Sequence, residues 1–116
     1  MENMDKILRI YSRLVALQKN LPSTVSINEK YVKEYNAIVN ELENVSQSEL
    51  FEFKILDSQA ERMVTSVNYR TGDTNYSNER YCEKNYMLSK MEALIGYFNF
   101  RYFSEEKINI GFKPQV

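Results

Sequence analysis

The chain contains no histidine and a single cysteine, Cys82, among its 116 residues. Without these side chains the common zinc sites cannot be built, and the Ser-His and Cys-His pairs of nucleophilic catalysis are missing. A histidine pH switch is excluded for the same reason. The three glycines, Gly72, Gly96 and Gly111, are too far apart to form a phosphate-binding loop. These absences predict a protein that is not an enzyme and that holds no metal and no cofactor.

Carboxylates are the remaining groups that could carry acid–base chemistry. Glu79 and Glu83 are one helical turn apart at an expected helix start, where acids favour the positive end of the helix dipole. Asp57 and Glu61 have the same spacing beside another expected start, and no acids follow an EF-hand spacing. We therefore interpret these pairs as solvated surface residues, with no small-molecule substrate in evidence.

The sequence also lacks a long apolar run and a strong charge of one sign. No stretch approaches the roughly 20 apolar residues that span a bilayer, and an N-terminus carrying Glu2 and Asp5 is unlike a signal peptide. The net charge of −1 argues against a general polyanion binder. Because a lone Cys82 cannot form an internal disulfide, we expect a cytoplasmic protein with no membrane contact.

The length and the apolar fraction of 43% are typical of one globular domain with its own core. We expect residues 1–112 to form a single helical domain. Residues 113–116 read as a loose C-terminal end that a longer chain could continue.

Two amphipathic helices are predicted near the N-terminus. The first has apolar residues with 3-4-3-4 spacing and ends before Pro22. The second follows the capping-box pattern of residues 26–29 and repeats apolar residues with the same heptad-like spacing. A short loop joins them, so we expect an antiparallel αα-hairpin of residues 4–20 and 27–45.

A short third helix is expected after the second capping box at residues 46–49, ending near Ile55 with Leu50, Phe51 and Phe53 on its buried side. A long helix over residues 78–100 is then predicted to complete a small, mainly α bundle. Its apolar stripe is made of Tyr81, Leu88, Met91, Ile95, Phe98 and Tyr102. Cys82 lies on the same helix beside Tyr81, and we expect it to be a partly buried thiol. A line of small residues, Ser89, Ala93 and Gly96, predicts a close helix crossing.

Two β-hairpins remain as alternatives within this mainly α fold. Residues 63–69 have β-branched content and precede a turn signal at Thr71-Gly72-Asp73, so a short hairpin could form in 63–76. Apolar residues also alternate with polar ones in 98–102 and again in 108–112, which would suit a hairpin over 97–112.

The aromatic residues suggest a function as a protein-interaction or self-association domain. Five of the fifteen rings lie between residues 97 and 103, and aromatic clusters containing arginine are typical interface anchors. We predict a homodimer, or binding to another protein, through an aromatic patch at the end of the last helix. The patch consists of Tyr97, Phe98, Phe100, Arg101, Tyr102 and Phe103.

The alternative is a small nucleic-acid-associated protein of the regulator, mobile-element or phage type. Residues 1–22 carry four cations against two acids, and cations interleave with tyrosines in residues 70–102. Such mixtures grip single strands without reading their sequence. The residues that would do so are Lys6, Arg9, Arg13, Arg80 and Lys84.

Overall fold

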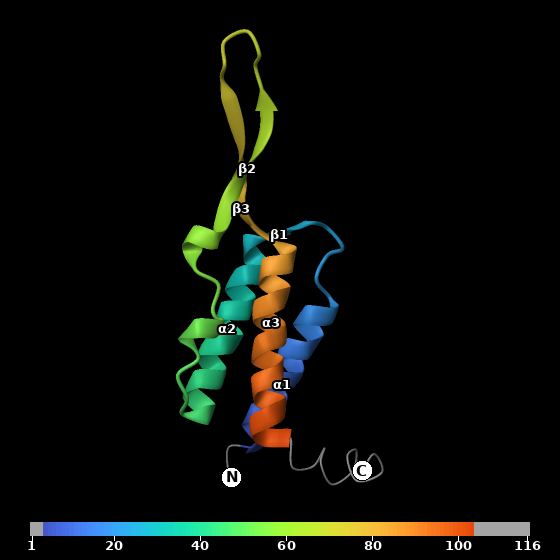
Figure 1. Cartoon of the computed structure of the whole chain (residues 1–116), viewed down its shortest axis with the longest axis vertical. Helices are drawn as coiled ribbons and strands as arrows, with labels where there is room; N and C mark the ends of the chain where they lie inside the picture. The colour runs from blue at the N-terminus through green and yellow to red at the C-terminus, as the bar shows by residue number, and fades with distance from the viewer. Residues whose placement is uncertain (1–3, 104–116) are drawn as a thin grey trace.

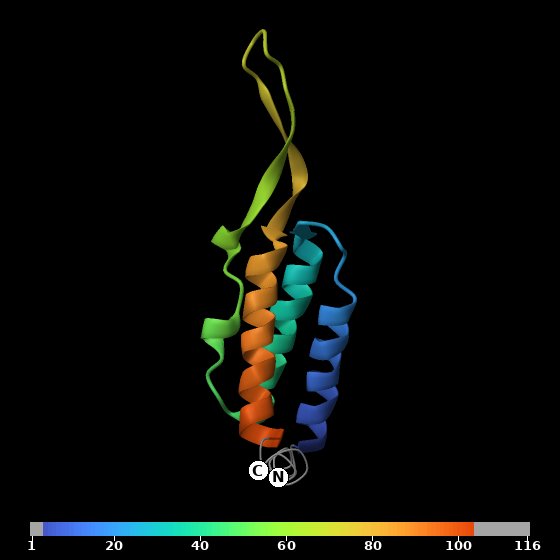
Figure 2. The ribbon, with the colours of Figure 1, turned by 45° about the vertical axis from the view of Figure 1, so that its right-hand side comes forward.

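A computed structural model describes residues 4–103 of the chain. The molecule is elongated, with a long axis of 67 Å against 32 Å for the next. Three helices lie side by side in a bundle, and a pair of strands projects from one end of it (Figures 1 and 2). We call this projection, residues 60–83, the arm.

The helices and strands follow one another in a simple order. They are α1 (Met4–Lys19), β1 (Ser26–Asn28), α2 (Glu29–Ser46), β2 (Ala60–Val67), β3 (Thr74–Glu83) and α3 (Lys84–Phe98). Two 3₁₀ turns, Phe51–Phe53 and Asp57–Gln59, lie between α2 and β2, and a π-helical turn, Asn99–Phe103, extends α3.

The predicted αα-hairpin of α1 and α2 is confirmed. Both helices bury their apolar stripes against each other and against α3, and they run in opposite directions (Figure 1). The cap of α2 is Asn28 rather than the expected Ser26, because the Asn28 side chain accepts a hydrogen bond of 2.8 Å from the Lys30 N–H. The helix ends at Ser46 and is capped by Gln47, whose φ of 58° places it in the left-handed region.

The prediction of a mainly α bundle is wrong, because the chain is mixed α/β. A three-stranded antiparallel sheet has the order β1-β3-β2. The helix expected over residues 78–100 begins only at Lys84, and the residues before it form β3. Cys82 therefore lies on a strand, where it pairs with Ile27 of β1 and Ala60 of β2 and is 1% exposed. The hairpin considered for 63–76 is present but longer, since it reaches 60 and 83.

The arm twists because its register shifts twice. The two shifts lie on either side of Val64, between Arg62 and Ser66. At the first shift, the Met63 N–H donates to a side-chain oxygen, Ser77 Oγ, at 2.9 Å, in place of a backbone carbonyl of the neighbouring strand. Bulges of this kind bend the strands and increase their twist. The tip turns at Gly72, whose φ of 81° suits a residue without a Cβ.

The end of α3 decides between helix and hairpin for residues 97–103. This segment is helical, so the hairpin considered for 97–112 is wrong there, and residues 104–112 and 113–116 lie outside the described part. The expected close crossing at Ser89, Ala93 and Gly96 is also wrong. These residues are exposed, and a Cβ added to Gly96 would meet no atom within 4 Å.

The segment between α2 and the arm is held to the bundle by side chains of α2. The Tyr35 hydroxyl donates to the Phe53 carbonyl at 2.6 Å, and Asn36 binds both backbone groups of Ile55, at 2.8 and 2.9 Å. Leu50 and Ile55 are buried, whereas Phe51, expected on the buried side, is 63% exposed. Polar anchors on α2 therefore fix the path of a segment with little regular structure.

Replacing Asn36 with alanine is expected to lower the free energy of unfolding by about 2 kcal/mol. The substitution leaves the N–H and the carbonyl of Ile55 without their partners in a partly buried position. Urea denaturation measures the loss, with Asn40→Ala, at an exposed position of the same helix, as the matched control. Equal stability of the two variants would show that the Asn36 bonds contribute nothing.

Candidate interaction surfaces

The predicted aromatic patch is divided between the core and the surface. Phe98 is fully buried, and its ring lies 6.4 Å from Tyr11, 5.3 Å from Tyr97 and 5.3 Å from Tyr102. The ring of Tyr102 stacks on it with an interplanar angle of 17°. Phe98 therefore belongs to the monomer core and has no surface to offer a partner.

The polar groups of the patch bind within the chain. Arg101 donates to the Tyr97 hydroxyl at 2.7 Å and also to Ser48 Oγ. The ring of Tyr97 packs on Phe53 with centroids 5.7 Å apart. These contacts tie the end of α3 to the segment after α2.

Phe100 is the member of the patch that faces solvent. It is 78% exposed, because it lies on the opposite side of the helix from Phe98 and Tyr102. The side chain of Phe103 lies outside the described part of the structure. Of the described rings in the predicted patch, Phe100 is the one that is mostly exposed, while Tyr97 and Tyr102 are partly buried against the core.

The predicted nucleic-acid residues are dispersed over the molecule. Lys6, Arg9 and Arg13 are exposed on α1, while Arg80 lies on β3 and Lys84 begins α3 at the arm end of the bundle. The structure does not gather them into one basic surface.

Several of these cations also have partners. Arg9 pairs with Asp5 at 3.1 Å, and Arg13 binds both carboxylate oxygens of Glu41, at 2.8 and 2.9 Å. The hydrogen bonds from Arg13 lower the pKa of Glu41 below its ordinary value. Lys84 Nζ donates to the Pro22 carbonyl at 2.6 Å. Arg9 and Arg13, whose charges are offset by carboxylates, offer little to a phosphate backbone.

The arm is a surface that the sequence analysis did not identify. Every residue from 61 to 76 is exposed, including five large apolar or aromatic ones. Their exposed fractions are 43% for Met63, 54% for Val64, 39% for Val67, 94% for Tyr69 and 50% for Tyr76. The only sequence signals were the β-branched content of 63–69 and the turn at 71–73, and neither indicates that the strands leave the bundle.

The arm is nearly neutral. Over residues 60–83 the net charge is −1, because three cations stand against four acids: Arg62, Arg70 and Arg80 against Glu61, Asp73, Glu79 and Glu83. The cations therefore nearly cancel against the acids, and the exposed apolar groups dominate the surface.

A cavity of about 390 Å³ lies where the arm leaves the bundle. Its lining residues are Asp57, Ser58, Ala60, Glu61, Arg62, Tyr76 and Arg80. A second cavity of about 280 Å³ on the α2 side shares Asp57, Ala60 and Arg80 with the first. We call the first one the arm-base cavity.

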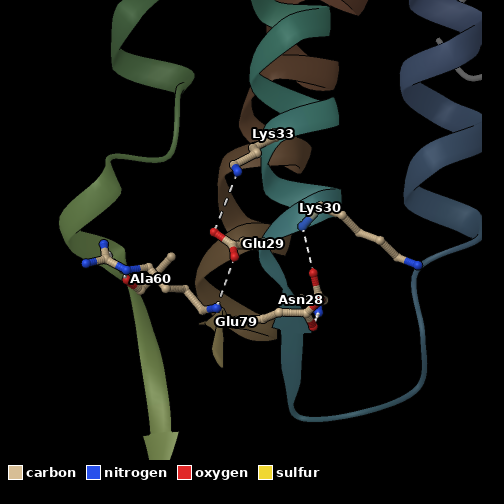
Figure 3. A network of polar contacts seen from close by, with 7 residues as sticks. Asn28, Glu29, Lys30, Lys33, Ala60 and Glu79 are labelled. Carbon is tan, nitrogen blue, oxygen red and sulfur yellow. Dashed lines mark hydrogen bonds and ion pairs between the residues drawn. The ribbon is translucent and has the colours of Figure 1, made fainter. Parts of the chain in front are cut away.

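A polar network fixes β3 beside the start of α2 (Figure 3). The Glu29 carboxylate accepts a hydrogen bond of 3.3 Å from the Arg80 N–H and lies 3.8 Å from Lys33 Nζ. Asn28 donates to Glu79 at 2.5 Å. Because backbone and side-chain groups of β3 are both held, the base of the arm has a defined position on the bundle.

Other kinds of site find little support in the described residues. Among residues 4–103, no three histidine, cysteine, aspartate or glutamate side chains gather as a metal site would require. Burial raises the pKa of Cys82, which disfavours the reactive thiolate. None of the described helices combines the length and the apolar character needed to cross a bilayer.

Comparison with known proteins adds no relative. The sequence matches no protein-family model, and neither curated proteins nor solved structures show significant similarity to it.

Proposed function

We propose that this chain is a non-catalytic protein-interaction domain in which the helical bundle presents the arm to a partner. The observation that carries the proposal is the uninterrupted exposure of residues 61–76 with their apolar side chains. A two-stranded hairpin is marginally stable on its own, and contiguous exposed apolar groups mark interaction sites. The arm gives little to the core, so we infer that its role lies in binding.

A protein partner suits this surface better than a nucleic acid. The arm has one more acid than cations, whereas binding to phosphate backbones requires an excess of cations. Tyr69 and Tyr76, with Met63, are the kinds of side chain that anchor protein interfaces. The lone Cys82, buried as a thiol, fits a reducing compartment, and a cytoplasmic location is part of the proposal.

The partner would contact side chains rather than extend the sheet. β2 forms an edge of the sheet, but the register shifts on both sides of Val64 disturb the regular spacing that an added strand would need. Bulges are a common protection of exposed sheet edges against pairing.

The test is partner capture by variants of the arm. The double variant Val64→Thr, Tyr69→Ser removes two exposed apolar groups and keeps residues that tolerate an extended or turn conformation. We expect about a tenfold or greater loss of affinity for proteins captured by the unmodified chain and identified by cross-linking at the arm. The matched control is Phe51→Ser, which removes an exposed ring from the bundle. Equal capture by all three proteins would contradict the proposal.

Self-association through the end of α3 is a second candidate, favoured by the 78% exposure of Phe100 beside the buried ring of Phe98 and the partly buried rings of Tyr97 and Tyr102. The substitution Phe100→Arg places a charge at an exposed position, so it is expected to disperse a dimer without unfolding the chain. Sedimentation velocity at micromolar concentration measures the oligomeric state of the unmodified chain and of the variant. A monomeric unmodified chain, or a dimer that survives the substitution, would eliminate this candidate.

A further inference from the structure

We propose that the arm-base cavity binds a carboxylate side chain of the partner protein between Arg62 and Arg80. This assignment rests on the proposed function, because it names the chemistry by which a protein bound to the arm is recognised. It adds a charged contact at the base of a surface whose upper part is apolar.

The two arginines oppose each other across the arm. Arg62 of β2 is the register partner of Arg80 of β3, and both line the cavity. Like charges in directly opposite positions of a sheet destabilise it. A bound anion between them would remove this repulsion.

Contacts within the chain position the guanidinium groups but leave most of their donors free. Arg62 Nε donates to the Ser77 carbonyl at 2.8 Å, and its guanidinium carbon lies 5.7 Å from the centre of the Tyr76 ring. Arg80 Nη1 donates to the Ala60 carbonyl at a long 3.5 Å. Since a guanidinium has five N–H donors, each side chain keeps several for a ligand.

Neither arginine has a carboxylate partner within the described residues. No ion pair within 4.0 Å involves Arg62 or Arg80 there, whereas Arg9 and Arg13 are each paired with an acid. Asp57 and Glu61 line the same cavity without reaching either guanidinium at that distance. The cavity is thus lined by two exposed guanidinium groups that a carboxylate from outside can bind in the planar geometry that arginine favours.

The surroundings favour a single carboxylate over a phosphate polymer. Asp57 and Glu61 in the cavity and Glu79 on β3 repel every anion, and a phosphate polymer, which carries a charge on each nucleotide, is repelled more strongly than a single carboxylate. Tyr76 lines the cavity and is half exposed, so it joins the arginines to the apolar surface above them. The occupant that fits is an extended peptide with an acidic residue followed by apolar ones.

The probe for the test is the dipeptide acetyl-glutamyl-valinamide, compared with its glutamine analogue and with inorganic phosphate. NMR of the arginine side-chain Nε–H groups of the full chain reports binding at each arginine. We expect saturable chemical-shift changes at Arg62 and Arg80 with a dissociation constant of about a millimolar for the glutamate dipeptide. The glutamine analogue should bind at least about tenfold more weakly.

Arg80→Gln should weaken binding of the glutamate dipeptide about tenfold or more, because it removes one of the two guanidinium groups that bind the carboxylate. Arg70→Gln is the matched control, since it removes the same charge from the arm outside the cavity. Absence of saturable shifts, equal binding of the two dipeptides, or equal effects of the two substitutions would overturn the proposal. Tighter binding of phosphate would also overturn it, by assigning the cavity to a different ligand.

Partner capture separates this inference from the function on which it rests. If Arg80→Gln captures the partner as well as the unmodified chain while the Val64→Thr, Tyr69→Ser variant fails, the carboxylate site is wrong and the interaction arm stands. If the Val64→Thr, Tyr69→Ser variant also captures normally, the proposed function itself fails.

Discussion

Replacing Phe98 with alanine is expected to lower the free energy of unfolding by about 3–5 kcal/mol, the range for removing a buried aromatic ring. Phe98 is fully buried and contacts the rings of Tyr11, Tyr97 and Tyr102. The substitution would remove these contacts and leave a cavity where α3 meets α1. Chemical denaturation followed by circular dichroism measures the change.

Phe100→Ala is the matched comparison, because it removes the same ring two residues away. Its side chain is 78% exposed, so the expected change in unfolding free energy is within about 0.5 kcal/mol. The two substitutions would have similar effects if residues 97–103 formed a strand with both rings on one face. A cost for Phe100→Ala close to that for Phe98→Ala would therefore contradict the helical end of α3.

The same two residues show why the sequence misled at this point. Phe98, Phe100 and Tyr102 alternate with polar residues, which fits one face of a strand. In a helix, residues four apart share a face and residues two apart do not. Phe98 and Tyr102 therefore stack in the core while Phe100 points to solvent. The sequence could therefore locate the aromatic cluster but could not show which of its rings are buried and which are exposed.

The part of the fold that sequence reasoning predicted well is the part with one buried face. In α1, the four positions spaced 3-4-3 from Ile7 to Leu17 are all buried, and in α2 the centre of the stripe, Tyr35, Ile38 and Leu42, is buried as well. Burial against a neighbouring helix imposes a period near 3.6 on the apolar residues. The antiparallel pairing then follows from the short connection between the helices.

The arm could not be predicted in the same way, because neither of its faces is buried between residues 61 and 76. In β2 only Ala60 is buried, and the seven residues after it are exposed, so no alternation of apolar and polar residues is imposed. Tyr81 of β3 lies seven residues before Leu88 of α3, a spacing that also fits one face of a helix. This coincidence explains why the helix was predicted to begin before Lys84. The arm-base cavity was missed for the same reason. Arg80 was considered only for nucleic acid, and its register partner Arg62 is visible only once the strands are paired.

The effect of replacing Tyr35 with phenylalanine is expected to reverse with pH. Tyr35 is fully buried, and its hydroxyl donates to the Phe53 carbonyl. At neutral pH the substitution should cost about 1–2 kcal/mol, because this carbonyl loses its hydrogen bond. Burial also raises the pKa of Tyr35 far above its ordinary value, so the folded chain keeps the phenol protonated where the unfolded chain does not.

The sign follows from proton linkage. A group whose pKa is raised by folding stabilises the folded state fully below its unfolded pKa and loses that contribution as the pH rises toward its folded pKa. With an unfolded tyrosine pKa of about 10, the unmodified chain loses about 1.4 kcal/mol from this group by about pH 11, whereas Tyr35→Phe loses nothing from it. The difference between the two proteins should therefore shrink to near zero around pH 11 and favour the variant above it.

Urea denaturation of both proteins between neutral pH and about pH 11.5 measures this difference. The range extends from below to above the ordinary tyrosine pKa of about 10, so the phenol of the unfolded chain ionises within it. Taking the difference cancels the alkaline effects that the two chains share, including that of Cys82, whose pKa is also raised by burial. Tyr69→Phe at the exposed arm tip controls for the loss of one tyrosine hydroxyl. A constant difference between the unmodified chain and Tyr35→Phe would mean that the Tyr35 hydroxyl ionises as readily in the folded chain as in the unfolded one. The packing of residues 50–56 against α2 would then be looser than the 2.6 Å bond to Phe53 implies.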